Sequence, residues 1–197
     1  MEKNLGNILE ESGELILDSL IENELLKEIP VIGTSVKIIR AVKSIRDTAY
    51  LNKVKTFVEQ LGEINDAQRK RLVEESKKDI KRRVKFGNAL FTTIEQSESL
   101  IKVQYSAIAF EAFLNEDFEE SDLRLICHII RNSFTDELID IVENDIPKTD
   151  LKFVVPSGLA ENVYVPLLAS GYGNEPEYNL TISAKQLREA WKKYRTK

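Results

Sequence analysis

Residues 86–114 read FGNALFTTIEQSESLIKVQYSAIAFEAFL, and this stretch decides the class of fold that the sequence predicts. Its apolar residues, among them Leu90, Ile94, Ile101 and Ile108, recur at the spacing of one face of an α-helix. The stretch carries less charge than the other long helical segments, and its alanines allow neighbouring elements to approach closely. We therefore predict one long helix over residues 86–114 at the centre of a helical core.

Helical spacing continues on both sides of this stretch. It predicts helices over residues 5–29, 35–61, 67–85 and 119–131, and a short sixth helix that Ser133 caps and that ends before Pro147. The apolar stripe of the 67–85 segment is thin, which indicates a helix that is mostly exposed or that has a partner. The fold class is thus mainly α, with a bundle of about six helices as the domain of residues 1–146.

The character of the chain changes after Pro147. Runs rich in Val, Tyr and Ile at 153–155, 163–165 and 178–182 predict two or three short strands, with a turn at 171–174. A last helix is expected to start at Ser183 as its cap and to run through Tyr194. Residues 147–197 are therefore predicted to form a small α+β tail made of a strand pair and a helix.

Composition places the chain among folded intracellular proteins. Of its 197 residues 42% are hydrophobic and 31% are charged, as in a globular domain. Cys127 is the only cysteine, which favours a reducing compartment. The acidic residues near the start do not fit a secretion signal, and no apolar run is long enough to span a membrane. We expect a cytoplasmic protein.

Charge is segregated along the sequence. The net charge is only −5, but residues 37–85 hold 15 bases and 7 acids, whereas residues 86–150 hold 14 acids and 4 bases. Residues 1–36 are acidic as well, so a basic block lies between two acidic ones. A basic block of this kind points to an anionic partner, or to pairing with the acidic parts of the same protein.

The densest basic cluster lies in the predicted 67–85 helix, and further cations occur in the last helix. Either these cations bind nucleic acid, phospholipid or an acidic protein, or they form a solvated face whose charges pair within the chain. Acids interleaved with the bases support the second interpretation through local helix pairs. The candidate residues for an anionic partner are Arg69, Lys70, Arg71, Lys77, Lys78, Lys81, Arg82, Arg83, Lys85, Lys192 and Lys193.

The sequence offers no set of residues for catalysis. Cys127 and His128 are neighbours that point about 100° apart on a helix, so they cannot act together as nucleophile and base. One Cys and one His do not suffice for a tetrahedral zinc site, and both are expected in the core or at its boundary. The acids at 10–14 and 116–122 lack the spacing of a calcium loop, and Gly33 lies in no Walker motif. We expect no enzyme, no metal and no cofactor.

A membrane-surface interpretation exists for residues 29–55. An uncharged turn precedes an amphipathic segment with several Lys and Arg residues, which is the composition of an interfacial helix. The alternative is an ordinary core helix with a basic outer face.

Several short motifs are spread over most of the chain: Ile29-Pro30-x-x-Gly33-Thr34, Ile45-Arg46-Asp47, Ser157-Gly158-Leu159 and Tyr178-x-Leu180-Thr181. With these motifs the chain resembles a family of uncharacterised bacterial and phage-borne helical proteins, although the motifs are structural and of low specificity. The resemblance implies a winged-helix-like tail and an accessory role in mobile-element or defence biology, and it implies no catalytic residues.

Taken together, these patterns favour a non-enzymatic interaction protein that binds a protein partner. The first alternative is a nucleic-acid-binding protein that uses residues 67–85 and the C-terminal tail. The second is a peripheral membrane protein that uses residues 29–55. Pairing of the thin-striped 67–85 helix with its own copy would also make the protein a homo-oligomer.

Overall fold

The structure is a computed structural model that describes residues 13–23, 26, 45–62, 64–77, 80–144, 146–163 and 176–195. For residues 45, 72, 73, 75–77, 80–86 and 149 it describes the backbone alone. Residues 13–22 are helical. The elements that follow are α4 (Ile45–Leu61), α5 (Asp66–Lys77), α6 (Ile80–Gln96), α7 (Leu100–Leu114), α8 (Glu120–Asn132), α9 (Thr135–Val142), the 3₁₀-helix η1 (Lys148–Val154), β1 (Ala160–Val163), β2 (Glu177–Leu180) and α10 (Ile182–Tyr194). The predicted fold class, mainly helical with a strand pair and a final helix, is confirmed.

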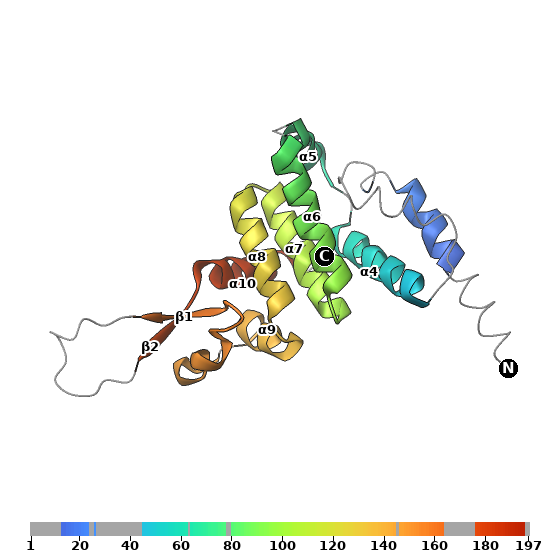
Figure 1. Cartoon of the computed structure of the whole chain (residues 1–197). Helices are drawn as coiled ribbons and strands as arrows, with labels where there is room; N and C mark the ends of the chain where they lie inside the picture. Colours follow the sequence, from blue (N-terminus) through green and yellow to red (C-terminus); the bar gives the residue numbers. More distant parts are fainter. Residues whose placement is uncertain are drawn as a thin grey trace, which may run out of the picture.

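Helix α7 lies at the centre of the molecule. Helices α4, α6, α8 and α10 all pack against it, with α4 and α10 on either side of it in Figure 1. Every residue from 102 to 114 except Gln104 is buried, including the large side chains of Tyr105 and Phe110. A helix that is largely apolar on all sides must be covered on all sides, and this explains why five helices, α5 included, contact it.

The prediction of a single helix over residues 86–114 is wrong, because α6 and α7 are separate helices joined by Ser97, Glu98 and Ser99. Ser99 is the N-cap of α7, and its hydroxyl accepts a hydrogen bond from the backbone N–H of Lys102 at 3.3 Å. The hydroxyl of Ser97 donates to the carbonyl of Thr93 at 2.6 Å, at the end of α6. Serine hydroxyls of this kind compete with the helical backbone and so end one helix and start the next.

The predicted 67–85 helix is also two helices. Helix α5 ends at Lys77 and α6 begins at Ile80, and residues 78–79 lie outside the described part of the chain. The basic cluster is therefore divided between two elements. Within the first two predicted helices, residues 13–22 and α4 are helical and residue 23 is not, whereas residues 5–12, 24–25, 27–29 and 35–44 lie outside the described part.

Two predicted helix caps are wrong by one or two residues. Ser133 is the C-cap of α8, where its hydroxyl donates to the carbonyl of Ile129 at 2.8 Å, and Phe134 is the N-cap of α9. Helix α10 is capped by Thr181, whose hydroxyl accepts from the backbone N–H of Ala184 at 3.3 Å, and Ser183 is buried inside the helix.

Among its described residues, the tail contains one strand pair. Strands β1 and β2 are antiparallel, with Ala160 opposite Leu180. The strand predicted at 153–155 is wrong, because Phe153 and Val154 belong to η1. Leu151 and Val154, three residues apart, are both buried, and a 3₁₀-helix brings residues at this spacing onto one face. Of the strand predicted at 163–165, Val163 belongs to β1, and residues 164–165 lie outside the described residues, as does the turn predicted at 171–174.

One hydrophobic core includes residues on both sides of Pro147. Helix α10 packs against α7, α8 and α9, and it buries Ala184, Leu187 and Tyr194 in the same cluster as the residues of α7. The tail helix therefore completes the core of the helical bundle. No helix in the described part of the chain is long and apolar enough to cross a membrane.

Candidate functional site

Arg71 is paired within the protein. Its guanidinium makes an ion pair with Glu116 at 3.0 Å and donates to the carbonyl of Phe118 at 3.2 Å. It also lies 4.6 Å from the centre of the Phe113 ring, and its side chain is only 12% exposed. A planar cation that stacks on a ring and holds the end of α7 has a structural role here.

Lys193 is held in the same way from α10. Its ammonium is 2.7 Å from an Asp117 carboxylate oxygen, and the Tyr194 hydroxyl donates to the other oxygen at 2.6 Å. The hydrogen bond to Asp117 raises the pKa of Lys193, and burial raises the pKa of Tyr194. The loop between α7 and α8 thus binds one cation from α5 and one from α10.

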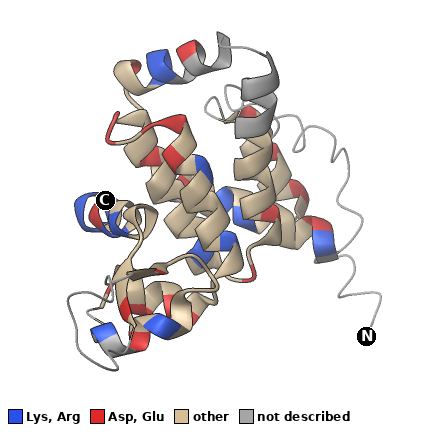
Figure 2. Ribbon diagram, turned by 60° about the vertical axis from the view of Figure 1, so that its left-hand side comes forward, with Lys and Arg blue, Asp and Glu red and all other residues tan. Residues whose placement is uncertain are grey.

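The side chains of only some of the remaining basic candidates are described. The side chain of Lys70 is 78% exposed, with Glu74 of the same helix 3.9 Å away, and Lys192 is close to Glu189 at 3.2 Å. Arg69 is half-buried. Lys78 lies outside the described residues, and for Lys77, Lys81, Arg82, Arg83 and Lys85 only the backbone is described. Figure 2 shows basic and acidic residues interspersed over the described helices.

Cys127 and His128 do not form a reactive pair. Cys127 is buried, and this burial raises the pKa of its thiol to about 11. His128 is exposed, so its expected place in the core or at its boundary is wrong, and its ring contacts Asn132 at 2.8 Å. Within the described residues no three of His, Cys, Asp or Glu are grouped as metal ligands.

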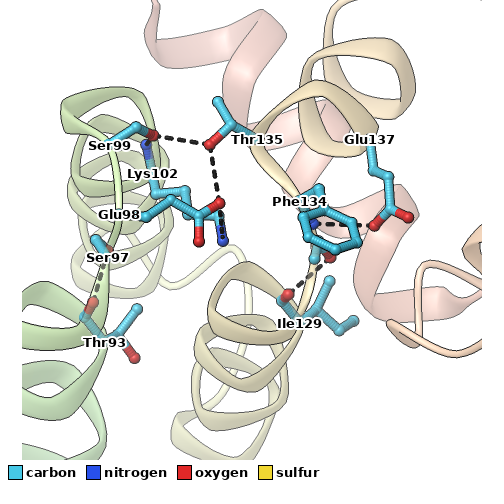
Figure 3. A network of polar contacts seen from close by, with 10 residues as sticks. Thr93, Ser97, Glu98, Ser99, Lys102, Ile129, Phe134, Thr135 and Glu137 are labelled. Atoms are coloured by element: carbon cyan, nitrogen blue, oxygen red, sulfur yellow. Dashed lines mark hydrogen bonds and ion pairs between the residues drawn. The ribbon is translucent and has the colours of Figure 1, made fainter.

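A polar network joins the α6–α7 turn to the start of α9, and Figure 3 shows it at close range. The Lys102 ammonium, 1% exposed, is 2.9 Å from a Glu98 carboxylate oxygen, and the Thr135 hydroxyl donates to the same carboxylate at 3.2 Å. The hydroxyls of Ser99 and Thr135 are 3.0 Å apart. The hydrogen bond from Lys102 lowers the pKa of Glu98. These contacts fix the direction in which α9 leaves the bundle.

The start of α9 presents acidic residues to a surface depression. The backbone N–H of Phe134 donates to the Glu137 carboxylate at 3.0 Å, which closes the first turn. A depression of about 570 Å³ then lies between α9 and η1. The described residues that line it include four carboxylates and no Lys or Arg: Asp136, Glu137, Asp140, Asn144, Ile146, Pro147, Asp150, Phe153 and Val154.

Two phenylalanine side chains stand in solvent at this surface. Phe134, the N-cap of α9, is 73% exposed, and Phe153, which lines the depression, is 65% exposed. Figure 3 shows the Phe134 ring beside Glu137. Single exposed apolar side chains are common, but one exposed ring in the lining of an acidic depression and a second at the start of the adjacent helix mark a candidate contact surface. We call Phe134, Phe153 and the lining of this depression the α9–η1 surface.

A second depression, of about 590 Å³, lies between α10 and the α7–α8 loop. Its lining mixes charges, with Asp117 and Glu189 against Lys185, Lys192 and Lys193. Because Asp117 and Glu189 already contact lysines of this lining, the second depression is less suited to a ligand of one charge.

Sequence reasoning did not identify the α9–η1 surface. It assigned apolar residues to the core and sought a site among the cations. The available signal was Phe134 itself, an aromatic residue between a helix end and the acidic start Asp136-Glu137. The chain matches no protein-family model, no curated protein and no solved structure.

Proposed function

We propose that this protein is a non-enzymatic, cytoplasmic interaction protein that binds a protein partner through the α9–η1 surface. The observation that carries the proposal is the pair of exposed rings, Phe134 and Phe153, of which Phe153 lines a depression that also has four carboxylates in its lining. Aromatic residues are enriched at protein–protein contacts because they combine a large apolar area with few rotatable bonds. The family resemblance adds the hypothesis of a bacterial or phage accessory role in mobile-element or defence biology.

Capture of partners from a bacterial lysate by the tagged protein tests this proposal. The double variant Phe134→Ser/Phe153→Ser removes both rings, and Leu15→Gln is the matched control because Leu15 is 70% exposed on the helix of residues 13–22. A protein that is captured by the wild type and by Leu15→Gln, and is lost with the double variant, supports the proposal. If no captured protein depends on the two rings, the proposal is wrong.

Nucleic-acid binding by residues 67–85 and the tail is the second candidate function. The exposed side chain of Lys70 favours it, whereas the internal pairs of Arg71 and Lys193 leave those two cations less accessible to phosphate. An electrophoretic shift at about 50 mM salt that Lys70→Glu weakens and Lys55→Glu leaves unchanged supports this candidate. The absence of any shift at that salt contradicts it.

Membrane-surface binding by residues 29–55 remains a hypothesis about a segment of which residues 29–44 lie outside the described part. Within α4, the Lys53 ammonium donates to the carbonyl of Glu95 at 2.7 Å, and Lys55 is 3.7 Å from Glu59. Sedimentation with anionic vesicles tests it, and protein that stays in the supernatant contradicts it.

A further inference from the structure

The lining of the α9–η1 depression combines apolar residues with carboxylates. Ile146, Pro147, Phe153 and Val154 are its apolar residues, and the Phe153 side chain is 65% exposed. This combination requires a ligand that has an apolar part as well as a charged part. A small hydrophilic ion would leave the apolar residues uncovered, and a purely apolar ligand would desolvate the carboxylates without adding an opposite charge.

The described lining of the depression carries four carboxylates and no Lys or Arg. Two cations lie next to this lining: the Lys152 ammonium is 5.0 Å from the centre of the Phe153 ring, and the Arg188 guanidinium donates to the carbonyl of Asn144 at 2.8 Å. Because the carboxylates outnumber these two cations, the surface favours a cationic ligand over phosphate.

The two exposed carboxylates of α9 are spaced so that one helix or strand of a partner can contact both of them. Asp136 and Asp140 are four residues apart on α9, and both are exposed. Residues at this spacing lie on one face with about 5–6 Å between their Cβ atoms. A Lys or Arg in a partner can therefore reach one or both carboxylates while an adjacent apolar side chain enters the depression.

We infer that the occupant of the α9–η1 surface is a cationic amphipathic segment of the partner protein, with Lys or Arg next to Leu or aromatic residues. The inference deepens the proposed function and rests on it. The Lys or Arg contacts Asp136 and Asp140, and the apolar side chain packs between Phe153 and Val154. Because Asp136 and Asp140 are exposed, the charge pairs act on specificity and association rate as well as on affinity.

Binding of three labelled synthetic peptides of about 15 residues, which is long enough for four helical turns, tests the inference. The first carries Lys and Leu at amphipathic spacing, the second carries Glu in place of Lys, and the third carries Lys with Ser in place of Leu. We expect the first to bind at least about tenfold more tightly than the other two, and its affinity to fall when salt rises from about 50 to about 300 mM. Equal binding of the two Lys peptides contradicts the inference, because it shows attraction by charge alone.

A pair of protein variants locates the contact. Asp136→Asn/Asp140→Asn removes two carboxylates from the α9–η1 surface, and Glu14→Gln/Asp18→Asn removes two exposed carboxylates with the same spacing from the helix of residues 13–22. We expect about tenfold weaker binding of the first peptide to the α9 variant and no change with the control. Equal losses in both variants would overturn the inference. Chemical shift changes of the backbone amides on peptide addition should concentrate in α9 and η1, and changes centred on other elements would also contradict it.

The lysate experiment separates this inference from the proposed function. If the captured partner is lost with Phe134→Ser/Phe153→Ser and retained with Asp136→Asn/Asp140→Asn, the proposed function stands and the cationic nature of the partner is wrong. If the partner is lost with both double variants and retained with both controls, both are supported. If neither double variant affects capture, the proposed function fails and the inference fails with it.

Discussion

The Lys102–Glu98 pair shows how one buried charge depends on its partner. Lys102 is buried in α7, whereas the Glu98 carboxylate reaches solvent. We expect Glu98→Gln to lower the free energy of unfolding by about 1–3 kcal/mol, because the ammonium stays buried with only a neutral acceptor. Lys102→Met removes the buried charge and keeps the volume, so its cost should be below about 1.5 kcal/mol. Urea unfolding measures the free energy of unfolding of both variants. A larger decrease for Lys102→Met than for Glu98→Gln contradicts this explanation.

The same pair predicts a dependence on pH. Because the hydrogen bond from Lys102 lowers the pKa of Glu98, the ionised carboxylate stabilises the folded state at pH values above the ordinary carboxyl pKa. This contribution is lost as the pH falls through the lowered pKa of the folded state. The difference in unfolding free energy between wild type and Glu98→Gln should therefore be largest near neutral pH and shrink below about pH 4. A difference that is constant with pH disproves this role for Glu98.

Glu116 occupies a backbone position that favours glycine. Its φ is +63°, its N–H donates to the carbonyl of Phe113, and the next N–H, of Asp117, donates to Ala112. This is the arrangement in which glycine commonly ends a helix. Glu116→Gly and Glu116→Ala both remove the partner of Arg71, so their difference isolates the backbone. We expect Glu116→Gly to be more stable than Glu116→Ala by about 1 kcal/mol in urea unfolding. Equal stability of the two variants would falsify the backbone explanation.

At the scale of elements, the hydroxyls of Ser99 and Thr135 couple α7 to α9 across their 3.0 Å contact. Ser99→Ala removes the N-cap of α7 and should cost about 1 kcal/mol. In a double-mutant cycle with Thr135→Val, the two changes should be non-additive by at least about 0.5 kcal/mol, because they share one contact. Thermal unfolding of the four proteins measures this coupling energy. Additive effects show that the two helices are not linked through this contact.

The elements that could be predicted from the sequence are those with one dominant apolar face. Helix α8 agrees with its predicted range because Leu123, Ile126 and Ile130 form a clear stripe that begins after acidic residues. The break between α6 and α7 was missed because the apolar spacing continues from Ile94 to Ile101 across it, while the decisive contacts are serine hydroxyls. The spacing of apolar residues does not reveal such caps, because the capping residues are polar.

The tail and the candidate surface show that short stretches of sequence do not reveal which residues distant segments will bury. Phe153-Val154-Val155 has strand-like composition, but burial of Leu151 and Val154 on one face selects a 3₁₀-helix. Which phenylalanines remain exposed depends on contacts between distant segments. Phe110 and Phe113 are fully buried in α7, whereas Phe134 and Phe153 are largely exposed, and composition does not separate them.

At the scale of the whole molecule, one hydrophobic core contains residues from both predicted parts of the chain, 1–146 and 147–197. Leu151, Leu159 and Leu187 are buried in one cluster with the residues of α7. A fragment of residues 1–146 should therefore lose the cooperative thermal unfolding of the full chain and expose apolar surface to a hydrophobic dye. Circular dichroism during heating tests this expectation. Cooperative unfolding of the fragment at the temperature of the full chain would show that residues 1–146 are an independent domain.

The burial of α7 on all sides has a consequence during protein synthesis. Helix α7 leaves the ribosome before α8 and long before α10, so two of the helices that cover it are not yet available. Until α10 emerges, the nascent chain displays part of its most apolar helix, and a chaperone has the opportunity to bind there. Slow translation between residues 114 and 182 should prolong this exposure and increase the yield of aggregated chains.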